Sequence, residues 1–291
     1  MRLVLDGFGG LAYIQVHGVR LPVGVPNYDC RLCSMKKMFV FTIALCICLC
    51  GCRANSPPQE HVATTTSTTT TTITTSTTTT TTTKPPSSVR LYVKNIMQNP
   101  ELPTGCEITS ATILLNYYGY AVNKEQMCEY LPQSNKFYYK DGILIGPDTN
   151  EYFVGNPRTT SGRALQCFAP VIEKTINYYF AESQSQYRAK AIVGKDLEYF
   201  YSYLSGGNPV CVWTTIGMVK AAKVQGWYND SMELVTSYRN LHCLVMTGYD
   251  EQYVYVADPL GQFTKVDKVL FEDRYKSVGS QAVVLGCDDL P

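Results

Sequence analysis

The clearest helical pattern in the chain starts near Cys106, where apolar residues recur every three or four positions until Gly119 interrupts them. This pattern predicts a helix from Cys106 to about Tyr118. Two further helices are expected at residues 124–131, where Pro132 ends the pattern, and at residues 195–204. The apolar positions of the first helix are Ile108, Ala111, Leu114, Leu115 and Tyr118.

Strand patterns flank these helices. Alternating polar and apolar residues predict a short strand at 91–96, and a continuous apolar run predicts a buried strand at 210–216. Between the helices, residues 137–170 are rich in Gly and Pro and are expected to be mostly loop.

Residues 242–258 give the clearest hairpin pattern, with two strand-like runs around a polar turn that we place at Tyr249 to Glu251. A three-residue loop there would set His242 directly opposite Asp258, with Cβ atoms about 5 Å apart. The same register puts four apolar side chains on one face, and a slip of one residue would break the arrangement. Those four are Leu244, Met246, Val254 and Val256.

The N-terminal part of the chain has the layout of an export signal. Two lysines precede twelve residues, 38–49, that are apolar except for Thr42, which is too short a run to cross a bilayer. We therefore predict a signal peptide at residues 35–51 and treat residues 1–34 as an upstream extension with no structural part. The closing Leu49-Cys50-Gly51-Cys52 resembles the lipobox of bacterial lipoproteins, which implies lipidation of Cys52; cleavage as a simple signal peptide at another bond is the alternative.

Residues 52–88 are rich in Thr and Pro, and between 64 and 83 every residue is Thr apart from two Ser and one Ile. Such a tract has nothing to bury and is expected to form an extended, hydrated stalk, with O-glycosylation as an option. About 36 residues could reach at most on the order of 120 Å. Residues 89–291 then form one folded domain, displayed on the outer face of a bacterial membrane by its lipid anchor.

The charge and the residue counts of that domain exclude some classes of partner and of site. It contains 18 Lys and Arg against 21 Asp and Glu, without a basic block, which argues against a nucleic-acid partner. His242 is its single histidine, so a site built from several histidines is excluded. The pair Cys30-x-x-Cys33 has no second half nearby and is interpreted as chance. We expect no metal and no cofactor.

Cys106 at the first turn of a helix is well placed to react, because the free N–H groups and the helix dipole favour a thiolate. His242 is the one imidazole that can serve as its base, and Asp258 can fix the tautomer. Gln98, in the loop before the helix, could donate to an oxyanion. Glu107 is interpreted as a favourable first-turn helix charge.

Three segments together resemble papain-like cysteine peptidases, and in particular the bacterial group similar to the double-glycine peptidases that process bacteriocin leaders. They are Gln98-Asn-Pro-Glu-Leu-Pro-Thr-Gly-Cys-Glu-Ile-Thr-Ser110, Leu241-His-Cys-Leu-Val-Met-Thr-Gly-Tyr-Asp250 and Ala257-Asp-Pro-Leu-Gly261. The resemblance implies an α+β fold in which the helix carrying the nucleophile packs on an antiparallel sheet carrying His and Asp. It also implies Cys106 as nucleophile, His242 as base, Asp258 as orienting acid and Gln98 as oxyanion donor.

Each of these residues also has a structural interpretation. Cys106 could be one more buried thiol, His242 a strand histidine with satisfied hydrogen bonds, and Asp258 the end of a strand before Pro259. Among the other residues, Trp213 is expected in the core, Cys211 and Cys243 as buried thiols, and Asn156-Pro157 either at the cleft or in a plain turn.

The sequence therefore favours a surface-anchored, monomeric cysteine peptidase or amidase that acts on a peptide or a cell-wall cross-link. Two alternatives remain open. The domain could be a non-catalytic display module on a papain-like shell, or it could pass its acyl group to an amine and act as a transpeptidase.

Overall fold

A computed structural model describes residues 2–5, 12–16, 19–23 and 85–287 of the chain. The predicted signal peptide, Cys52 and nearly all of the Thr/Pro-rich stalk lie outside the described residues, so these predictions stay predictions. Among the described residues, no helix combines the length and the apolar character that crossing a membrane requires.

Three short strands fall within the segment that we predict to be an upstream extension. They are β1 (Arg2–Leu5), β2 (Ala12–Val16) and β3 (Val19–Val23), and they pair antiparallel in a sheet of their own. No described strand of residues 85–287 belongs to this sheet, so it contributes nothing to the sheet that carries the candidate site.

The main sheet of the domain is antiparallel and has the strand order β15-β14-β13-β10-β16-β9, with β4 also paired to β13. The strand β13 lies near its centre and is buried along its whole length, so the residues it carries are held rigidly. The strands are β4 (Val89–Arg90), β9 (Tyr187–Val193), β10 (Val210–Thr215), β13 (Leu241–Tyr249), β14 (Tyr253–Ala257), β15 (Lys265–Asp267) and β16 (Gln281–Cys287).

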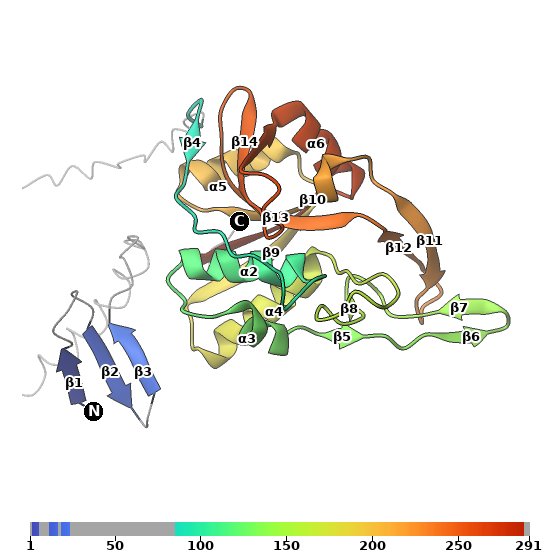
Figure 1. Ribbon diagram of the computed structural model, residues 1–291, viewed down its shortest axis with the longest axis horizontal. Coiled ribbons are helices and arrows are strands. Elements are labelled where there is room, and N and C mark those ends of the chain that lie inside the picture. The colour runs from blue at the N-terminus through green and yellow to red at the C-terminus, as the bar shows by residue number, and fades with distance from the viewer. Residues whose placement is uncertain (1, 6–11, 17–18, 24–84, 288–291) are drawn as a thin grey trace, which may run out of the picture. The chain divides into compact units, whose positions relative to one another are not determined.

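Helices cover both faces of this sheet (Figure 1). On one face are α2 (Cys106–Tyr117), α3 (Lys124–Glu129) and α4 (Ala169–Glu182). On the other are η1 (Leu197–Phe200), α5 (Tyr201–Ser205) and α6 (Lys268–Ser277). Successive strand residues point to opposite faces, so Cys243 and Val245 of β13 join the core under α2, whereas Leu244 and Met246 join the core under α5 and α6.

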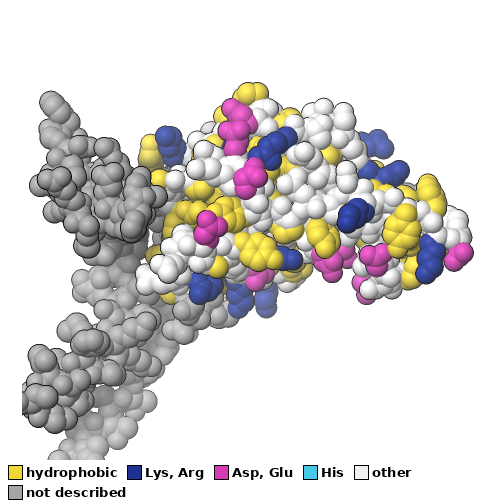
Figure 2. Space-filling model, turned by 90° about the horizontal axis from the view of Figure 1, so that it is seen from below, with side chains coloured by type: hydrophobic (Ala, Val, Ile, Leu, Met, Phe, Trp, Pro, Cys, Tyr) yellow, Lys and Arg dark blue, Asp and Glu magenta, His cyan; other side chains and the backbone are white. Residues whose placement is uncertain are grey.

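A second, smaller sheet extends from one end of the domain in the order β12-β11-β7-β6 (Figure 1). Its tip exposes apolar side chains, among them Tyr139 and Leu234. On the face shown in Figure 2, apolar side chains and charges of both signs are interspersed. The remaining elements are β5 (Gln133–Ser134), β6 (Tyr138–Lys140), β7 (Ile143–Ile145), β8 (Phe153–Val154), η2 (Ile216–Met218), β11 (Lys223–Tyr228) and β12 (Leu234–Tyr238).

Most of the elements that the sequence predicts are present. The helix at Cys106, the helix that begins at Lys124 and the buried strand that begins at Val210 all form. The strand expected at 91–96 is wrong, because β4 ends at Arg90. Past Leu91 the chain leaves the sheet, and Gln98 instead donates its backbone N–H to the carbonyl of Pro259 at 2.9 Å.

The hairpin of β13 and β14 forms, but not in the predicted register. Its turn lies one residue later than predicted, because the Asp250 side chain accepts the N–H groups of Gln252 and Tyr253 and organises the turn there. With a bulge after Met246, Val245 pairs with Ala257, so the direct pairing of His242 with Asp258 is wrong. The shift is two residues, a full strand period, and so both side chains keep the same face. The four apolar residues predicted to share a face lie in one core cluster.

We predict that burial of the apolar side chains of α2 stabilises the domain. Leu114→Ala, at a side chain with no exposure, should lower the free energy of unfolding by about 2–5 kcal/mol. The matched Leu234→Ala, at a side chain that is 61% exposed, should change it by less than about 0.5 kcal/mol. Chemical denaturation of both variants measures the two changes, and equal losses would contradict the prediction.

Candidate active site

The loop before α2 delivers Cys106 to the surface of a cleft. Cys106 is the first residue of the helix, and no described side chain caps the N–H groups of the first turn. These N–H groups and the helix dipole therefore point positive charge toward the Cys106 thiol. Gly105 allows the loop to pack closely, since a Cβ atom at this position would lie 2.8 Å from Cβ of Leu102.

One hydrogen bond ties α2 to the strand that carries the histidine. The Ser110 hydroxyl donates to the Cys243 carbonyl at 3.0 Å, one helical turn beyond Cys106 and one residue beyond His242. The helix and the strand are thus fixed relative to each other beside the two residues whose chemistry depends on their spacing.

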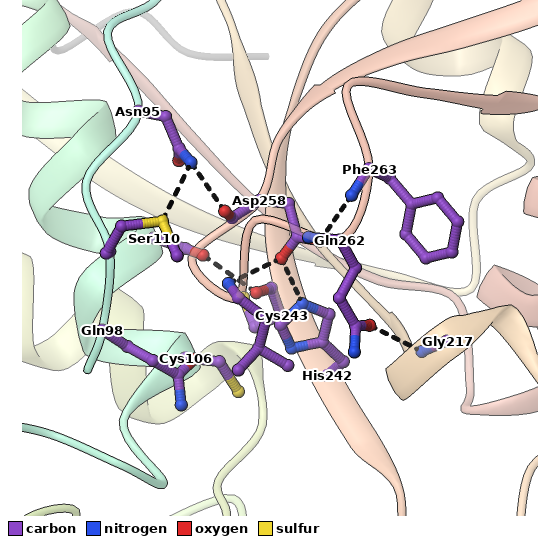
Figure 3. Close-up of polar contacts among 12 residues, drawn as sticks. Asn95, Gln98, Cys106, Ser110, Gly217, His242, Cys243, Asp258, Gln262 and Phe263 are labelled. Atoms are coloured by element: carbon purple, nitrogen blue, oxygen red, sulfur yellow. Dashed lines mark hydrogen bonds and ion pairs between the residues drawn. The ribbon is translucent and has the colours of Figure 1, made fainter. Parts of the chain in front are cut away.

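His242 and Asp258 form a buried pair, with Nε2 of the ring 2.7 Å from Oδ1 of the carboxylate and almost no exposure of either side chain (Figure 3). An ionised carboxylate only accepts hydrogen bonds, so the ring proton lies on Nε2. Nδ1 has no hydrogen-bond partner among the described residues, and His242 lines the same cleft as Cys106 (Figure 3). Of the two ring nitrogens, Nδ1 is therefore the one with a free lone pair.

The loop after β14 completes the coordination of Asp258. Its two carboxylate oxygens accept backbone N–H groups from Leu260, Gln262 and Phe263, at 2.9, 3.0 and 3.2 Å. Burial by itself raises the pKa of Asp258, but the hydrogen bond and charge of His242 and these backbone N–H groups outweigh it and lower the pKa below its usual value. Asp258 is therefore held as a carboxylate.

Gln98 is almost fully buried beside Cys106 (Figure 3), and its Nε2 donates to the Pro103 carbonyl at 2.7 Å. An amide nitrogen carries two protons, so one remains for another acceptor. The loop is anchored by Lys124 of α3, whose ammonium group contacts the carbonyls of Met97 and Gln98 and the carboxylate of Glu101.

A cleft of about 180 Å³ brings three of the predicted residues together, since Gln98, Cys106 and His242 all line it. Asp258 does not line the cleft and lies behind the ring of His242. The rest of the cleft wall is mostly apolar and carries one guanidinium group. It consists of Pro103, Thr104, Ala164, Leu165, Gln166, Ile216, Tyr238, Arg239, Leu241 and Leu260.

The surroundings of the Cys106 sulfur do not favour the thiolate as the sequence analysis expects. Burial raises the pKa of the Cys106 thiol well above its usual range, and the Glu107 carboxylate raises it further, whereas a backbone contact with Cys243 acts in the opposite direction. Sγ lies 3.2 Å from Oε2 of Glu107. Glu107 does stand in the first turn, but it is buried and touches the thiol instead of solvent.

Other residues named in the sequence analysis lie in the core or support the loop before Cys106. Trp213 is fully buried and donates its ring N–H to the Cys167 carbonyl, as expected of a core residue. Cys211 and Cys243 are buried, with their sulfur atoms 3.2 Å apart. Pro157 accepts the backbone N–H of Thr104, so this turn braces the loop before Cys106 and does not line the cleft. In the part of the chain that the structure describes, no group of three His, Cys, Asp or Glu is arranged to hold a metal ion.

Three residues that touch the site were not among the site residues that the sequence predicts. Lys124 holds the backbone of Gln98, Asn95 donates to the Asp258 carbonyl at 2.7 Å, and Glu107 contacts the Cys106 sulfur. Lys124 and Asn95 act through contacts far apart in sequence, which no local pattern reveals. Glu107 was visible as an acidic neighbour of Cys106, but its burial was not.

A cysteine at a helix N-terminus facing an antiparallel sheet with a histidine and an aspartate is the arrangement of the papain-like cysteine peptidases, and the α+β fold is of that class. Residues 90–283 match the family model described as Peptidase_C39 like family, and the chain belongs to this family. The predicted resemblance and the predicted fold class are confirmed.

One relative and one solved structure agree with this membership. The uncharacterized protein YvpB of Bacillus subtilis (strain 168) is 34% identical over 201 residues, which cover 69% of this chain and 75% of that protein. A solved structure from Bacillus anthracis, described as a C39-like peptidase, is 29% identical with a TM-score of 0.59 and covers 68% of this chain and 97% of its own. A double glycine motif protease from an AMS/PCAT transporter, solved with its leader peptide, is 15% identical with a TM-score of 0.38, covering 68% and 94%.

The buried pair predicts a single tautomer of His242. In the wild-type protein the Nε2–H form should dominate at neutral pH, and Asp258→Ala should remove this preference because the acceptor is lost. Nitrogen-15 NMR of the imidazole, assigned with the His242→Ala variant, measures the tautomer.

Asp250→Ala is the matched control, since Asp250 also organises a turn through N–H groups of the same hairpin but contacts no histidine. It should leave the His242 signals in place. A wild-type ring protonated at Nδ1, or an Asp258→Ala spectrum unchanged from wild type, would contradict the interpretation of the pair.

Proposed function

We propose that this chain is a surface-anchored thiol hydrolase that cleaves peptide or amide bonds with Cys106, His242, Asp258 and Gln98. The observation that carries the proposal is the position of His242. Its Nε2 is held by a buried carboxylate, its buried Nδ1 has no hydrogen-bond partner among the described residues, and His242 and Cys106 line the same cleft. In most structures the nitrogen atoms of a buried histidine with a purely structural role are hydrogen-bonded.

In the proposed reaction, Nδ1 of His242 takes the proton from Cys106, and the sulfur attacks the carbonyl carbon of the scissile bond. The carbonyl oxygen becomes an oxyanion, which the backbone N–H of Cys106 and the second amide proton of Gln98 stabilise. His242 then returns its proton to the leaving amine, and a thioester remains on Cys106. Water, activated by the same ring, hydrolyses the thioester; an amine in its place would give transpeptidation.

One observation favours the second candidate, a non-catalytic display module. The Cys106 thiol is buried beside a carboxylate and its pKa is raised, which by itself describes an inert thiol. The two candidates differ in whether any substrate is turned over, so a direct assay separates them.

Cys106→Ala and His242→Ala should each reduce cleavage of peptides or wall fragments by at least about 10³-fold, because each removes a group that forms or breaks bonds. Mass spectrometry of a broad peptide library and of cell-wall fragments measures the products. Cys128→Ala, at a cysteine of α3 outside the cleft, should retain wild-type activity. Cleavage that persists in Cys106→Ala, or no cleavage of any substrate by the wild-type protein, would overturn the proposal.

The surface location is proposed from the sequence of residues 35–88 alone. Cys52 would receive the lipid, and the Thr/Pro-rich stalk would hold the domain away from the bilayer. Cys52→Ala should move the protein from the membrane fraction to the soluble or secreted fraction and abolish labelling by a radioactive fatty acid. The neighbouring Cys50→Ala should keep both properties, and equal labelling of the two variants would contradict the assignment.

A further inference from the structure

Glu107 is buried, although a glutamate that only complements the helix dipole could remain in solvent. A first-turn glutamate normally reaches solvent, whereas Glu107 is 1% exposed. Its Oε1 accepts the backbone N–H of Cys167 at 3.1 Å, and its Oε2 lies 3.2 Å from the Cys106 sulfur. Both carboxyl oxygens are therefore engaged, one by the loop that precedes α4 and one by the candidate nucleophile.

No Lys or Arg of the described chain forms an ion pair with Glu107. The titratable groups that face it are thiols: Cys106 on its own helix, Cys167 on the loop before α4, and Cys243 on β13. His242 lines the cleft with Cys106, whereas Glu107 does not line it. A buried carboxylate without a cation is costly, so the neutral acid is favoured.

Burial, the largest cause, raises the pKa of Glu107 to about 7, although the N–H of Cys167 and the thiol of Cys106 pull it down. Both protonation states are therefore populated near neutral pH. They have opposite effects on the sulfur, because a carboxylate can only accept a hydrogen bond from the thiol, whereas a carboxylic acid can donate one to a thiolate.

We propose that Glu107 is a further catalytic residue of the proposed peptidase, which in its protonated form donates a hydrogen bond from Oε2 to the Cys106 thiolate and in its ionised form keeps the proton on the thiol. The inference rests on the proposed function. In the reactive state Cys106 is a thiolate, His242 carries the proton taken from it, and Glu107 is neutral. When Glu107 loses its proton to solvent, the thiolate would stand beside a second negative charge, so the proton on His242 returns to the sulfur.

The consequence is an upper pH limit for nucleophilicity. The population of the reactive state falls as the pH rises through the pKa of Glu107, because that state requires the protonated acid. An ordinary thiol behaves in the opposite way, since its thiolate fraction rises about tenfold per pH unit below its pKa. The sign of the pH dependence therefore separates the two cases.

Glu107→Gln is the informative variant. A carboxamide accepts the N–H of Cys167 with its oxygen and donates to the sulfur with its nitrogen, as the protonated acid would, but it cannot ionise. Glu125→Gln is the matched control, because it removes an exposed first-turn glutamate from the neighbouring helix α3. Alkylation of Cys106 by iodoacetamide, with the modified cysteine identified by mass spectrometry, reports thiolate without any substrate.

The ratio of the Glu107→Gln rate constant to the wild-type rate constant should rise about tenfold from pH 6 to pH 8, since a group with a pKa of about 7 loses most of its protons over this interval. The Glu125→Gln ratio should stay constant. A Glu107→Gln ratio that does not change with pH overturns the proposal.

The wild-type protein provides a second measurement that does not depend on folding of the variant. Its rate constant for alkylation of Cys106 should fall between pH 6 and pH 8, and a rise of about 100-fold, as for an ordinary thiol, overturns the role of Glu107. Because alkylation needs no substrate, a protein that cleaves no peptide would still reveal the effect of Glu107. Conversely, peptide cleavage with an unchanged alkylation ratio would retain the proposed function and remove Glu107 from it.

Discussion

The site depends on the buried carboxylate of Asp258. A charge with no exposure is tolerated only where its oxygens are satisfied, and here one ring nitrogen and three backbone N–H groups satisfy them. The same contacts fix the loop after β14 and the plane of the His242 ring. Asn95 and Gln98 then bind the backbone of this loop, so the segment before the helix is placed by the segment after the strand.

The pattern of apolar and polar residues was sufficient to predict the helix and the strands that carry the candidate site residues. The period of apolar residues after Cys106 locates the helix, and the two strand-like runs locate the hairpin of His242. The register was wrong by two residues, because side-chain hydrogen bonds of Asp250 decide where the turn lies and residue periodicity does not contain them. A shift of two residues leaves His242 and Asp258 on the same face of the sheet, and the contact between their side chains can therefore still form.

The sequence did not reveal two kinds of feature. One is the contacts between segments that are distant in the chain, and the other is the burial of individual polar side chains. Lys124 clamps the loop of Gln98 from another helix, and nothing near it in the sequence signals this. The acidic side chain of Glu107 was assigned to the helix dipole because neighbours from the loop before α4 and from β13 cannot be counted before the fold is known. These neighbours remove it from solvent and turn an ordinary helix charge into a group that touches the sulfur.

In the proposed reaction, Cys106 attacks a carbonyl carbon whose oxygen faces the Gln98 amide, and Nδ1 of His242 accepts the proton of the thiol. A crystal structure of the protein reacted with a peptide aldehyde tests this most directly. We predict a bond between Sγ of Cys106 and the aldehyde carbon, with the resulting oxygen hydrogen-bonded to the Gln98 amide and the Cys106 N–H, and Nδ1 of His242 beside the adduct. An adduct on another cysteine, an oxygen pointing away from Gln98, or no adduct at all would contradict it.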